Sequence, residues 1–379
     1  MTFTLCAAAF CLVATALNLG GLAIAAVRLR PRGKPRPTPA DAPAVTIIRP
    51  LCRINNYERE TLASTFMLDY PSYDIIFCLE DGNDPVAGLV YNLMEKFPEV
   101  RAQLLIGQER RTKNPKLNNC LKGWDAAENP WIIMADSNVL MPSDYIQQMM
   151  GRWTEKTGLV CSMPIGTRPD NFWAEIECAF LNTFQARWQY VGESLGQGFA
   201  QGKSMLMRRD IVEAGGGLLK TLGAEIAEDA AFTKLVRQSG LHVHLVNAPF
   251  AQPLGARTGQ EVWSRQARWA MLRRKTFPLM YLPELVTGGF FPIVAGIYAA
   301  WDANVNVAVV AAVLAALWFG SEALLARIAG WHFSSRMLLA CALRDFLLPP
   351  LWVVAWLQQD YVWRGNTVNV KQVVAEELE

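Results

Sequence analysis

The sequence predicts an α/β domain with a mostly parallel sheet, set between α-helical membrane segments near the two ends of the chain. Three observations predict this. Mean hydropathy is positive, at +0.14, with 52% hydrophobic residues. The longest uncharged runs lie near the two ends, and the middle alternates short β-rich runs with helical patterns. Strands that alternate with helices form right-handed βαβ crossovers in a parallel sheet.

Charge and cysteine usage exclude several classes of protein. The 379 residues carry a formal net charge of +2, so no global basic field marks a nucleic-acid binder. Charged residues make up 18%, below the roughly 25% usual for soluble domains, so a soluble domain with a few membrane spans is expected. The 8 cysteines form no CxxC pair, which favours a reduced, cytosol-facing domain.

Residues 1–27 carry no charged side chain and are long enough to cross a bilayer as an N-terminal transmembrane anchor. A basic, Pro-rich linker follows over residues 28–43, with five cations between Arg28 and Arg36. Basic residues beside a span stay cytoplasmic, so the domain after the linker should face the cytosol. A cleaved signal peptide is the alternative, but the segment has no basic start and is longer than such peptides.

Residues 285–357 are expected to form about three further membrane segments. Leu285–Trp301 and Ala303–Ser321 are uncharged, with a turn expected between them. The last segment, Met337–Leu357, is interrupted by Arg344–Asp345 and by two prolines, so a kinked or re-entrant segment is the alternative to a span. The side of the membrane that holds the tail, residues 358–379, depends on that choice. The Arg–Asp pair is either a functional site within the membrane or a pair satisfied between helices.

The soluble middle shows a regular alternation of elements. Strands are expected at Val45–Ile48, Asp74–Leu79, Ala102–Ile106 and Trp131–Ala135. Helices are expected at Tyr57–Phe66, Val86–Lys96, Lys116–Ala127 and Ala230–Ser239. Ligands of such sheets bind beyond the carboxyl ends of the strands.

Acidic residues follow two of these strands. Asp81 and Asp84 lie after the second strand, and Asp136 follows the fourth, with Asn138 two positions on. Residues i and i+2 of an extended segment point the same way, so Asp136 and Asn138 could face one ligand. Carboxylate and amide oxygens suit Mg²⁺ or Mn²⁺, which a sugar-nucleotide diphosphate requires. The competing interpretation is that these residues only form turns.

Two further patterns favour group transfer. Asp229 precedes a helix, whose N-terminus should keep the carboxylate ionised as a general base, although a simple helix-capping role is the alternative. Arg265, Arg268 and Trp269 share a helix face, where arginine can bind a diphosphate and tryptophan can wall an acceptor site. The alternative is a basic amphipathic helix on anionic lipid, and both roles can hold along one helix.

Motifs of other enzyme classes are missing from the sequence. It contains no GxxxxGK[ST] phosphate loop, no GxGxxG after a strand and no Gly-x-Ser-x-Gly elbow. His242 and His244 alternate in a strand-like stretch, which favours a polar strand face over a metal pair. Carboxylates are therefore the expected catalytic groups.

Taken together, these patterns resemble family 2 and, more closely, family 21 glycosyltransferases, the membrane-bound ceramide glucosyltransferases. The family pattern is three separated aspartates followed by (Q/R)xxRW, which Arg265-Gln-Ala-Arg268-Trp269 fits. Further matches are Arg49-Pro50-Leu51, Leu68-Asp69-Tyr70-Pro71, Asn83-Asp84-Pro85, Asn114-Pro115-Lys116-Leu117-Asn118-Asn119, Ala135-Asp136-Ser137, Met205-Leu206-Met207-Arg208-Arg209 and Ile226-Ala227-Glu228-Asp229. The resemblance covers residues 44–275 strongly, and it departs at Asp136-Ser-Asn, where the family pattern expects Asp-x-Asp.

This resemblance implies a cytosolic GT-A nucleotide-diphospho-sugar transferase domain over residues 44–263, with a mixed, mostly parallel sheet. Residues 264–284 would form the (Q/R)xxRW and interfacial helices. It also implies a role for each candidate residue: Asp229 is the catalytic base; Asp81, Asp84, Lys116, Asn118, Asp136 and Asn138 bind the donor; Asp136 holds the metal; and Arg265, Arg268 and Trp269 serve the leaving group and the acceptor.

The implied activity is an inverting transfer of glucose from UDP-glucose to the primary hydroxyl of ceramide, by a bacterial-type, multi-pass protein of the inner membrane. Alternatives within this fold are another lipid acceptor, such as a hopanoid or diacylglycerol, or another donor carrying GlcNAc, galactose or glucuronate. A membrane transporter is the alternative from outside the enzymes.

Overall fold

The computed structural model describes residues 2–30, 38, 41–108, 111–112, 115–223, 227–358, 360–363 and 366–369. Most of the predicted linker, most of the predicted tail, and Asn114 and Ile226 of the family-like motifs lie outside these residues. The chain divides into two units. The sheet unit comprises Pro31–Ile165, Gly192–Leu254 and Val373–Glu379, and the helical unit comprises Met1–Arg30, Gly166–Val191 and Gly255–Gln372. The region predicted as one domain, residues 44–263, therefore contributes to both units.

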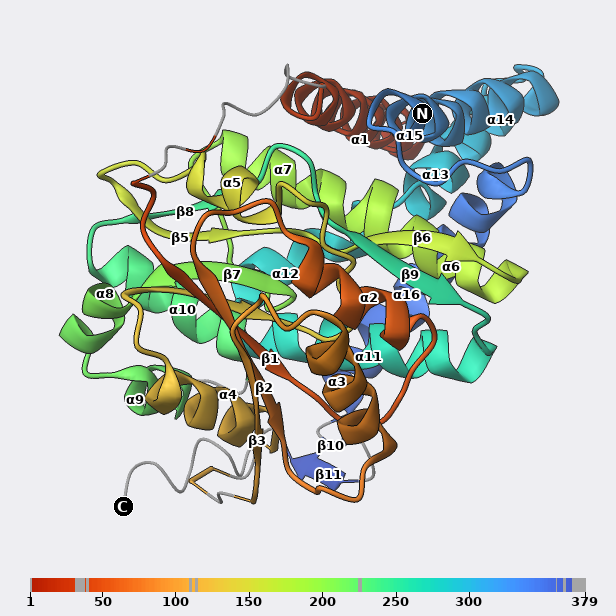
Figure 1. Ribbon diagram of the computed structural model, residues 1–379. Helices are drawn as coiled ribbons and strands as arrows, with labels where there is room; N and C mark the ends of the chain where they lie inside the picture. The colour runs from red at the N-terminus through yellow and green to blue at the C-terminus, as the bar shows by residue number, and fades with distance from the viewer. Residues whose placement is uncertain are drawn as a thin grey trace. The chain divides into compact units, whose positions relative to one another are not determined.

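The sheet unit is built on a seven-stranded mixed sheet with the strand order β3-β2-β1-β4-β7-β5-β8 (Figure 1). Strand β7 is antiparallel to its neighbours β4 and β5, and the other pairs are parallel. This confirms the predicted mixed, mostly parallel sheet. The strands are β1 (Val45–Pro50), β2 (Tyr73–Leu79), β3 (Ala102–Ile106), β4 (Trp131–Ala135), β5 (Thr157–Cys161), β7 (Ser204–Arg208) and β8 (His242–Leu245).

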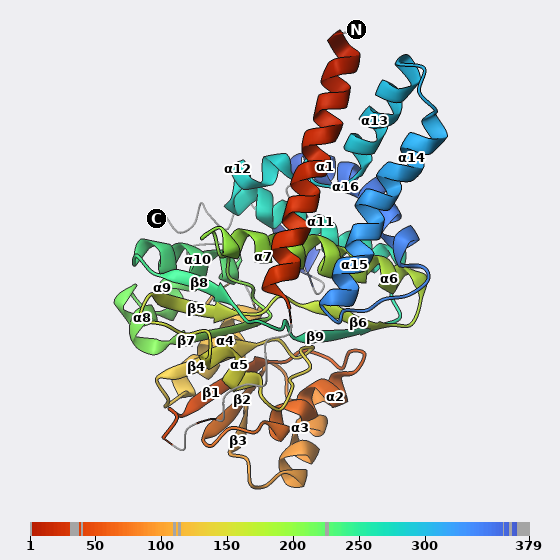
Figure 2. The same ribbon diagram turned by 90° about the horizontal axis from the view of Figure 1, so that it is seen from above.

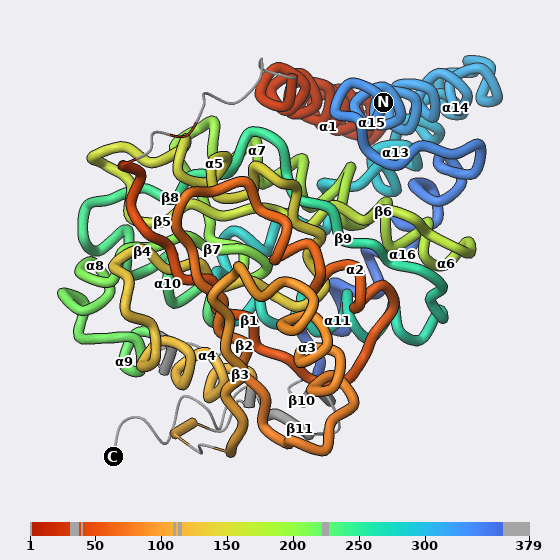
Figure 3. Tube along the Cα trace, viewed as in Figure 1, coloured from red at the N-terminus to blue at the C-terminus, as the bar shows by residue number. Residues whose placement is uncertain are grey.

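Helices cover both faces of this sheet. They are α2 (Glu58–Ala63), η1 (Ser64–Met67), α3 (Pro85–Lys96), α4 (Pro115–Ala126), α5 (Tyr145–Met150), α8 (Arg209–Ala214), α9 (Leu218–Gly223) and α10 (Glu228–Gln238). Figure 3 traces the chain through β1, β2 and β3, with α4 following them. The helix predicted over Tyr57–Phe66 ends early, at Ala63, where the chain tightens into the 3₁₀ turn η1.

Strand register decides which side chains of β1, β2 and β4 point to each face of the sheet. Ile47 pairs with Ile75 and with Ile133, so these side chains point to one face, where they belong to the clusters that include α5 and α3. The residues next to them along each strand point to the opposite face, toward α4. A Cβ on Gly123 of α4 would lie 2.5 Å from Ile48 Cγ2, so only glycine allows this close approach.

Three elements contain a boundary between the two units, so that one part of each belongs to either unit. They are β6 (Ile165–Pro169), α7 (Arg187–Ser194) and β9 (Ala251–Gly255). The helical unit holds α1 (Thr2–Arg28), α6 (Phe172–Ala179), the π-helical η2 (Phe180–Ala186), α11 (Gly259–Thr276), α12 (Pro278–Tyr281), η3 (Leu282–Val286), α13 (Phe290–Asp302), α14 (Val307–Ala315), η4 (Ala316–Gly320), α15 (Ser321–Ile328), α16 (Met337–Leu357), β10 (Asp360–Trp363) and β11 (Asn366–Asn369). Strands β10 and β11 form an antiparallel pair within the predicted tail.

Three helices of the described residues are long and apolar enough to cross a membrane: Thr2–Arg28, Val307–Ile328 and Met337–Leu357. Pro278–Val286 and Phe290–Asp302 form a bent pair, at 40°, that makes a fourth span or a re-entrant loop. Helix α1 lies beside α13 (Figure 2). The prediction of N- and C-terminal helices long and apolar enough to span a membrane is therefore confirmed.

The structure gives bounds to the C-terminal segments. The uncharged stretch Ala303–Ser321 contributes to a helix that begins at Val307 and runs on to Ile328, and Asn306 caps its first turn through Ala308 N and Val309 N. Met337–Leu357 is one helix that contains Pro349 and Pro350.

The Arg344–Asp345 pair is satisfied between helices of the helical unit. Arg344 donates to both oxygens of Glu322, at 2.9 and 3.0 Å, and to the hydroxyl of Thr183 at 3.1 Å. Asp345 accepts from the main-chain nitrogen of Gly289 at 2.6 Å. Since Arg187 lies 3.5 Å from Glu322, two buried cations balance two buried anions. Of the two alternatives raised by the sequence, this geometry matches the structural one.

Candidate active site

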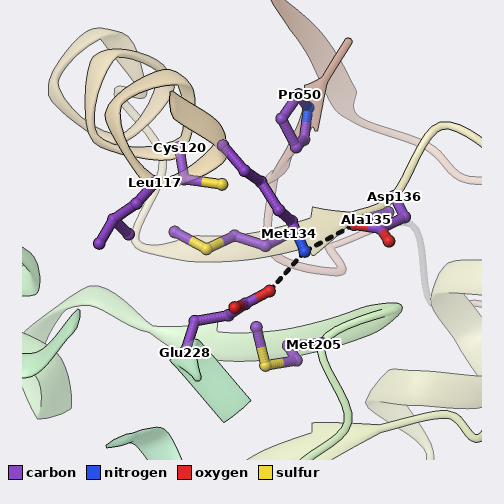
Figure 4. Close-up of a pocket in the computed structure, with 10 residues that line it drawn as sticks. Pro50, Leu117, Cys120, Met134, Ala135, Asp136, Met205 and Glu228 are labelled. Carbon is purple, nitrogen blue, oxygen red and sulfur yellow. Dashed lines mark hydrogen bonds and ion pairs between the residues drawn. The ribbon is translucent and has the colours of Figure 1, made fainter. Parts of the chain in front are cut away.

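Strand β4 carries the first candidate residue to the carboxyl end of the sheet. Its sequence WIIMA is buried from Ile132 onward, and the strand ends where Asp136 begins a turn. The main-chain nitrogen of Asp136 donates to the carbonyl of Lys203 at 3.0 Å, because β4 pairs with β7 in this register. A cavity of about 330 Å³ opens here, shown in Figure 4. Its lining residues are Pro50, Lys116, Leu117, Cys120, Met134, Ala135, Asp136, Gly202, Met205 and Glu228.

Two lysines bracket the Asp136 carboxylate. Lys116 Nζ lies 2.9 Å from Asp136 Oδ1, and Lys203 Nζ lies 2.7 Å from Asp136 Oδ2. Lys203 also donates to Asn138 Oδ1 at 3.2 Å, so the predicted i, i+2 pair does face one cation. Burial works against ionisation of Asp136, but the two ammonium groups outweigh it and hold its pKa well below its usual range. Asp136 is therefore a carboxylate throughout the neutral pH range.

Lys116 links Asp136 to the start of helix α10. Its ammonium is ion-paired with Glu228 as well as with Asp136, and the dashed lines of Figure 4 end on these two carboxylates. Burial lowers the pKa of Lys116, but the two carboxylates raise it by a larger amount. The pKa of Lys116 therefore lies well above its usual value. A permanent cation is thus fixed between Asp136 and Glu228, the neighbour of Asp229.

Asp229 follows Glu228 in the first turn of α10, and its Oδ1 accepts from Ala230 N at 2.8 Å. Burial raises the pKa of Asp229 to about 6, with a further rise from the neighbouring Glu228 and an opposing effect of Lys116. The sequence led us to expect that the helix N-terminus keeps Asp229 ionised; burial and the Glu228 carboxylate oppose this ionisation and raise the pKa. A carboxylate with this pKa is ionised at neutral pH yet basic enough to accept a proton.

Arg49 holds the turn that presents Asp136. It is fully buried at the end of β1, and its Nη2 donates to the carbonyls of Asp136 at 2.8 Å, Ser137 at 2.7 Å and Val139 at 3.2 Å. Burial lowers the pKa of Arg49 to about 10, an effect that nearby Glu58 opposes, so the guanidinium stays charged. Sequence reasoning noted Arg49 only as part of a family-like motif and missed this role.

Three predicted donor-binding residues lie elsewhere in the sheet unit. Asp84 caps α3 through Val86 N at 3.0 Å and accepts from Arg53 N at 2.7 Å. Asp81 accepts from Asn83 N at 2.9 Å, and Asn118 binds Thr112 through both ends of its amide. Among the residues that line the cavity, Lys116 and Asp136 are present and these three are not. Their donor-binding role stays a prediction.

The (Q/R)xxRW residues belong to the helical unit, on α11. Arg265 is ion-paired with the buried carboxylate of Glu177, which also lies 3.3 Å from Arg257 Nε. Two cations thus share this buried anion, and Glu261 of α11 interacts with both of them. Arg268 and Trp269 are half-buried on the same helix. Asp136 and Asp229 lie in the sheet unit, and the (Q/R)xxRW residues of α11 lie in the helical unit.

The side chains at the end of β4 fit a hard divalent cation that a diphosphate also ligates. The described residues contain no cluster of three His, Cys, Asp or Glu side chains that could hold a metal by themselves. They do provide one carboxylate and one amide oxygen, on Asp136 and Asn138, which converge on the ammonium of Lys203. Magnesium sites with phosphate ligands commonly use only one or two carboxylates, so this donor set is sufficient. Asp136 and Asn138 already stabilise one positive charge, the ammonium group of Lys203.

The sheet unit has the GT-A glycosyltransferase fold, and the chain carries helices long and apolar enough to cross a membrane. A mannosyltransferase from Pyrobaculum calidifontis, solved with GDP-Man and Mn²⁺, has this fold, with a TM-score of 0.52 at 17% identity over 90% of this chain and 99% of its own. The chain belongs to glycosyltransferase family 21, because the model described as "Glycosyl transferase family 21" matches residues 8–374.

Two curated relatives are named ceramide glucosyltransferases. Ceramide glucosyltransferase 3 of Caenorhabditis elegans is 27% identical over 338 residues, which cover 86% of this chain and 73% of the relative. Ceramide glucosyltransferase 1 of the same organism is 29% identical over 259 residues, which cover 68% of this chain and 55% of the relative. The family that the sequence resembles is thereby confirmed.

Proposed function

We propose that this protein transfers glucose from UDP-glucose to the primary hydroxyl of ceramide, with inversion at the anomeric carbon. The observation that carries the proposal is the network of charged side chains at the carboxyl end of the sheet. Asp136 is ion-paired with Lys116 and Lys203, and Lys116 is also ion-paired with Glu228. Asp229, next to Glu228, has a pKa of about 6. The two lysines suit an anionic diphosphate, and Asp229 suits a proton acceptor. The names of the two nematode relatives support ceramide as the acceptor.

In the proposed reaction Asp229 accepts the proton of the lipid hydroxyl. The hydroxyl oxygen forms a bond to the anomeric carbon from the face opposite the diphosphate, and the bond from that carbon to the diphosphate oxygen breaks. The electron pair leaves on UDP. Lys116 and Lys203 stabilise the negative charge that grows there, because their ammonium groups are already fixed before the reaction.

A bound Mg²⁺ or Mn²⁺ would supply further charge neutralisation at the diphosphate, with Asp136 and Asn138 as its protein ligands. On α11 we assign Arg268 to the departing UDP and Trp269 to the wall of the acceptor site. Arg265 would orient α11 through Glu177, since its guanidinium is already paired there. Asp81, Asp84 and Asn118 are proposed to shape the uridine side of the donor site.

The acceptor is a membrane lipid, which accounts for helices able to span a membrane in the same chain. The cluster of cations from Arg28 to Arg36 supports a cytosolic orientation of the sheet unit, as in a bacterial inner membrane. Ceramide would then reach the site from the cytosolic leaflet, and UDP-glucose from the cytosol.

A panel of substrates tests this assignment. Membranes that contain the protein are incubated with labelled UDP-glucose, UDP-galactose, UDP-GlcNAc or UDP-glucuronate, each with ceramide, diacylglycerol or a hopanoid. We expect labelled lipid with UDP-glucose and ceramide, and none when Asp136→Ala membranes replace the parent. Preferential labelling of diacylglycerol or hopanoid would move the protein to another lipid acceptor within the same family.

A further inference from the structure

Helix α16 is long and apolar enough to cross a membrane, yet within the helical unit it packs mainly on α11 and α6. Ala355 of α16 belongs to one buried cluster with Ala270 and Met271 of α11. Near the C-terminal end of both helices, the Arg274 guanidinium lies over the ring of Trp356, 5.3 Å from its centroid. The second half of α16 is therefore fixed along α11.

The helices on which α16 packs are charged. The charged residues of α11 are Glu261, Arg265, Arg268, Arg273, Arg274 and Lys275, and those of α6 are Glu175 and Glu177. A charged side chain is costly near the centre of a bilayer. The 21 residues of α16 extend over about 32 Å, close to the hydrocarbon thickness of about 30 Å. A transmembrane α16 would therefore carry α11, which is packed along it, into the hydrocarbon.

The other apolar helices of this unit form a bundle that α16 meets at one end. In this bundle α1 packs on α13 and α15, and α13 packs on α14 (Figure 2). Thr4 of α1 donates to Asp302, the last residue of α13. Phe346 of α16 contacts Phe290, the first residue of α13, with ring centroids 5.2 Å apart. The middle of α16 is therefore held at the end of α13 that lies away from Thr4.

The exposed side of α16 is apolar along the whole helix. Leu339, Phe346, Val353 and Leu357 are between 46% and 76% exposed, and their spacing places them on one face. Soluble proteins rarely expose a continuous apolar surface of this kind, which marks contact with a partner or a membrane. A helix with charged neighbours on one side and an apolar face on the other suits the surface of a bilayer.

We propose that α16 lies in the plane of the membrane surface, with this apolar face against lipid, and does not cross the bilayer. The partner is the bilayer because the face adjoins the apolar bundle through Phe346 and Phe290. Gln358, the residue after α16, then stays on the side of the membrane that holds α11. This is one of the two sides that the sequence leaves open for the tail, and the proposal holds for any sugar donor or lipid acceptor.

The depth of spin labels along α16 tests its orientation in the full-length protein in liposomes. Cys6 and Cys52, the two cysteines that are not buried, are first replaced by alanine. Nitroxides are then attached to Leu339→Cys, Phe346→Cys or Leu357→Cys. Their accessibility to O₂, which enters hydrocarbon, and to a nickel chelate, which stays in water, gives the depth of each label. We expect three similar, shallow depths.

The helix from Val307 to Ile328 provides the matched control, because we expect it to cross the bilayer. Val309→Cys, Leu317→Cys and Leu324→Cys carry the same label at exposed positions along this helix. The label at Leu317→Cys should be the deepest of these three. A depth profile of this shape along α16, with its maximum at Phe346→Cys, would overturn the proposal.

Labelling with a membrane-impermeant maleimide in sealed vesicles of both orientations tests the side of the tail. Gln358→Cys should react from the same side as Lys275→Cys, an exposed position at the end of α11. Ala303→Cys, exposed between α13 and α14, should react from the opposite side. Reaction of Gln358→Cys from the side of Ala303→Cys would show that α16 crosses the bilayer. Reaction of all three from one side would also contradict the proposal, because the bundle would then not cross.

Discussion

Arg49 Nη2 donates to the main-chain carbonyl of Asp136 at 2.8 Å, so a fully buried cation fixes the backbone of the proposed donor-binding turn. The same nitrogen also reaches the carbonyls of Ser137 and Val139. We therefore expect Arg49→Met to leave several buried carbonyls unpaired, at a cost of about 2–4 kcal/mol in the free energy of unfolding. Thermal unfolding in detergent should show a melting temperature lower by roughly 5–15 °C.

Arg59→Met is the matched control for this prediction, because Arg59 is exposed on α2 and its loss should hardly change the melting temperature. A second readout separates positioning from simple stability. In protein that remains folded at low temperature, Arg49→Met should raise the KM for UDP-glucose. An Arg49→Met protein with parental melting temperature and donor KM would show that Arg49 does not hold the turn.

The acid limb of the pH–rate profile should follow the charges around Asp229. Burial and Glu228 raise its pKa to about 6, so kcat should fall about ten-fold per pH unit below pH 6 and level off above it. Glu228→Gln removes a repelling carboxylate and should move this limb to lower pH. Lys116→Met removes a cation that favours ionisation and should move the limb to higher pH.

Lys203→Met is the control for these two shifts. It also takes a cation from Asp136, but it is not among the groups that act most strongly on Asp229, so the limb should keep its position. Shifts of the same sign in Glu228→Gln and Lys116→Met would show that another group sets the profile.

Chelation should abolish transfer if the diphosphate binds with a divalent cation at Asp136. EDTA is expected to remove activity, and Mg²⁺ or Mn²⁺ to restore it. Asn138→Asp turns Asp-Ser-Asn into Asp-Ser-Asp and adds a second carboxylate, so it should lower the metal concentration for half-maximal activity. Asn92→Asp, at an exposed position on α3 outside the cavity wall, should leave that concentration unchanged. Full activity in excess EDTA would assign charge neutralisation to Lys116 and Lys203 instead.

The buried pair of Arg344 and Glu322 should be a main source of stability in the helical unit. Arg344→Met leaves an unpaired buried anion, which typically costs about 3–5 kcal/mol, and should lower the melting temperature in detergent. Adding Glu322→Gln should recover part of the loss, since it removes the uncompensated charge. Arg336→Met, at an exposed position before α16, is the control. An additive or larger loss in the double variant would contradict the pairing.

Local patterns were enough to predict much of the fold. Ala102–Ile106 and Trp131–Ala135 match β3 and β4, because short apolar runs bounded by turn residues leave few alternatives. The Asp136–Asn138 pair follows from the two-residue period of an extended segment, and both side chains do face Lys203. The membrane helices were also visible, although capping by Asn306 moved the start of one of them.

The partners of these residues could not be predicted from local patterns. Lys203 reaches Asp136 only because β7 pairs antiparallel with β4, between positions far apart in the sequence. Arg49 stood out only as part of a family-like motif, and the parallel pairing of β1 with β4 brings it to the carbonyl of Asp136. The pKa of Asp229 likewise depends on burial and on Lys116, a residue of another helix.

The central claim is that Asp229 is the base of an inverting glucosyl transfer to ceramide. It is tested most directly by incubating purified protein in micelles with ceramide and UDP-glucose labelled at the anomeric carbon. The linkage of the lipid product is then read by NMR, for the parent and for Asp229→Asn. We predict β-linked glucosylceramide from the parent, since UDP-glucose is an α-glycoside, and at least a 10²-fold loss of product from Asp229→Asn, with UDP binding near parental. An α-linked product, or turnover of Asp229→Asn within a few-fold of the parent, would contradict the account.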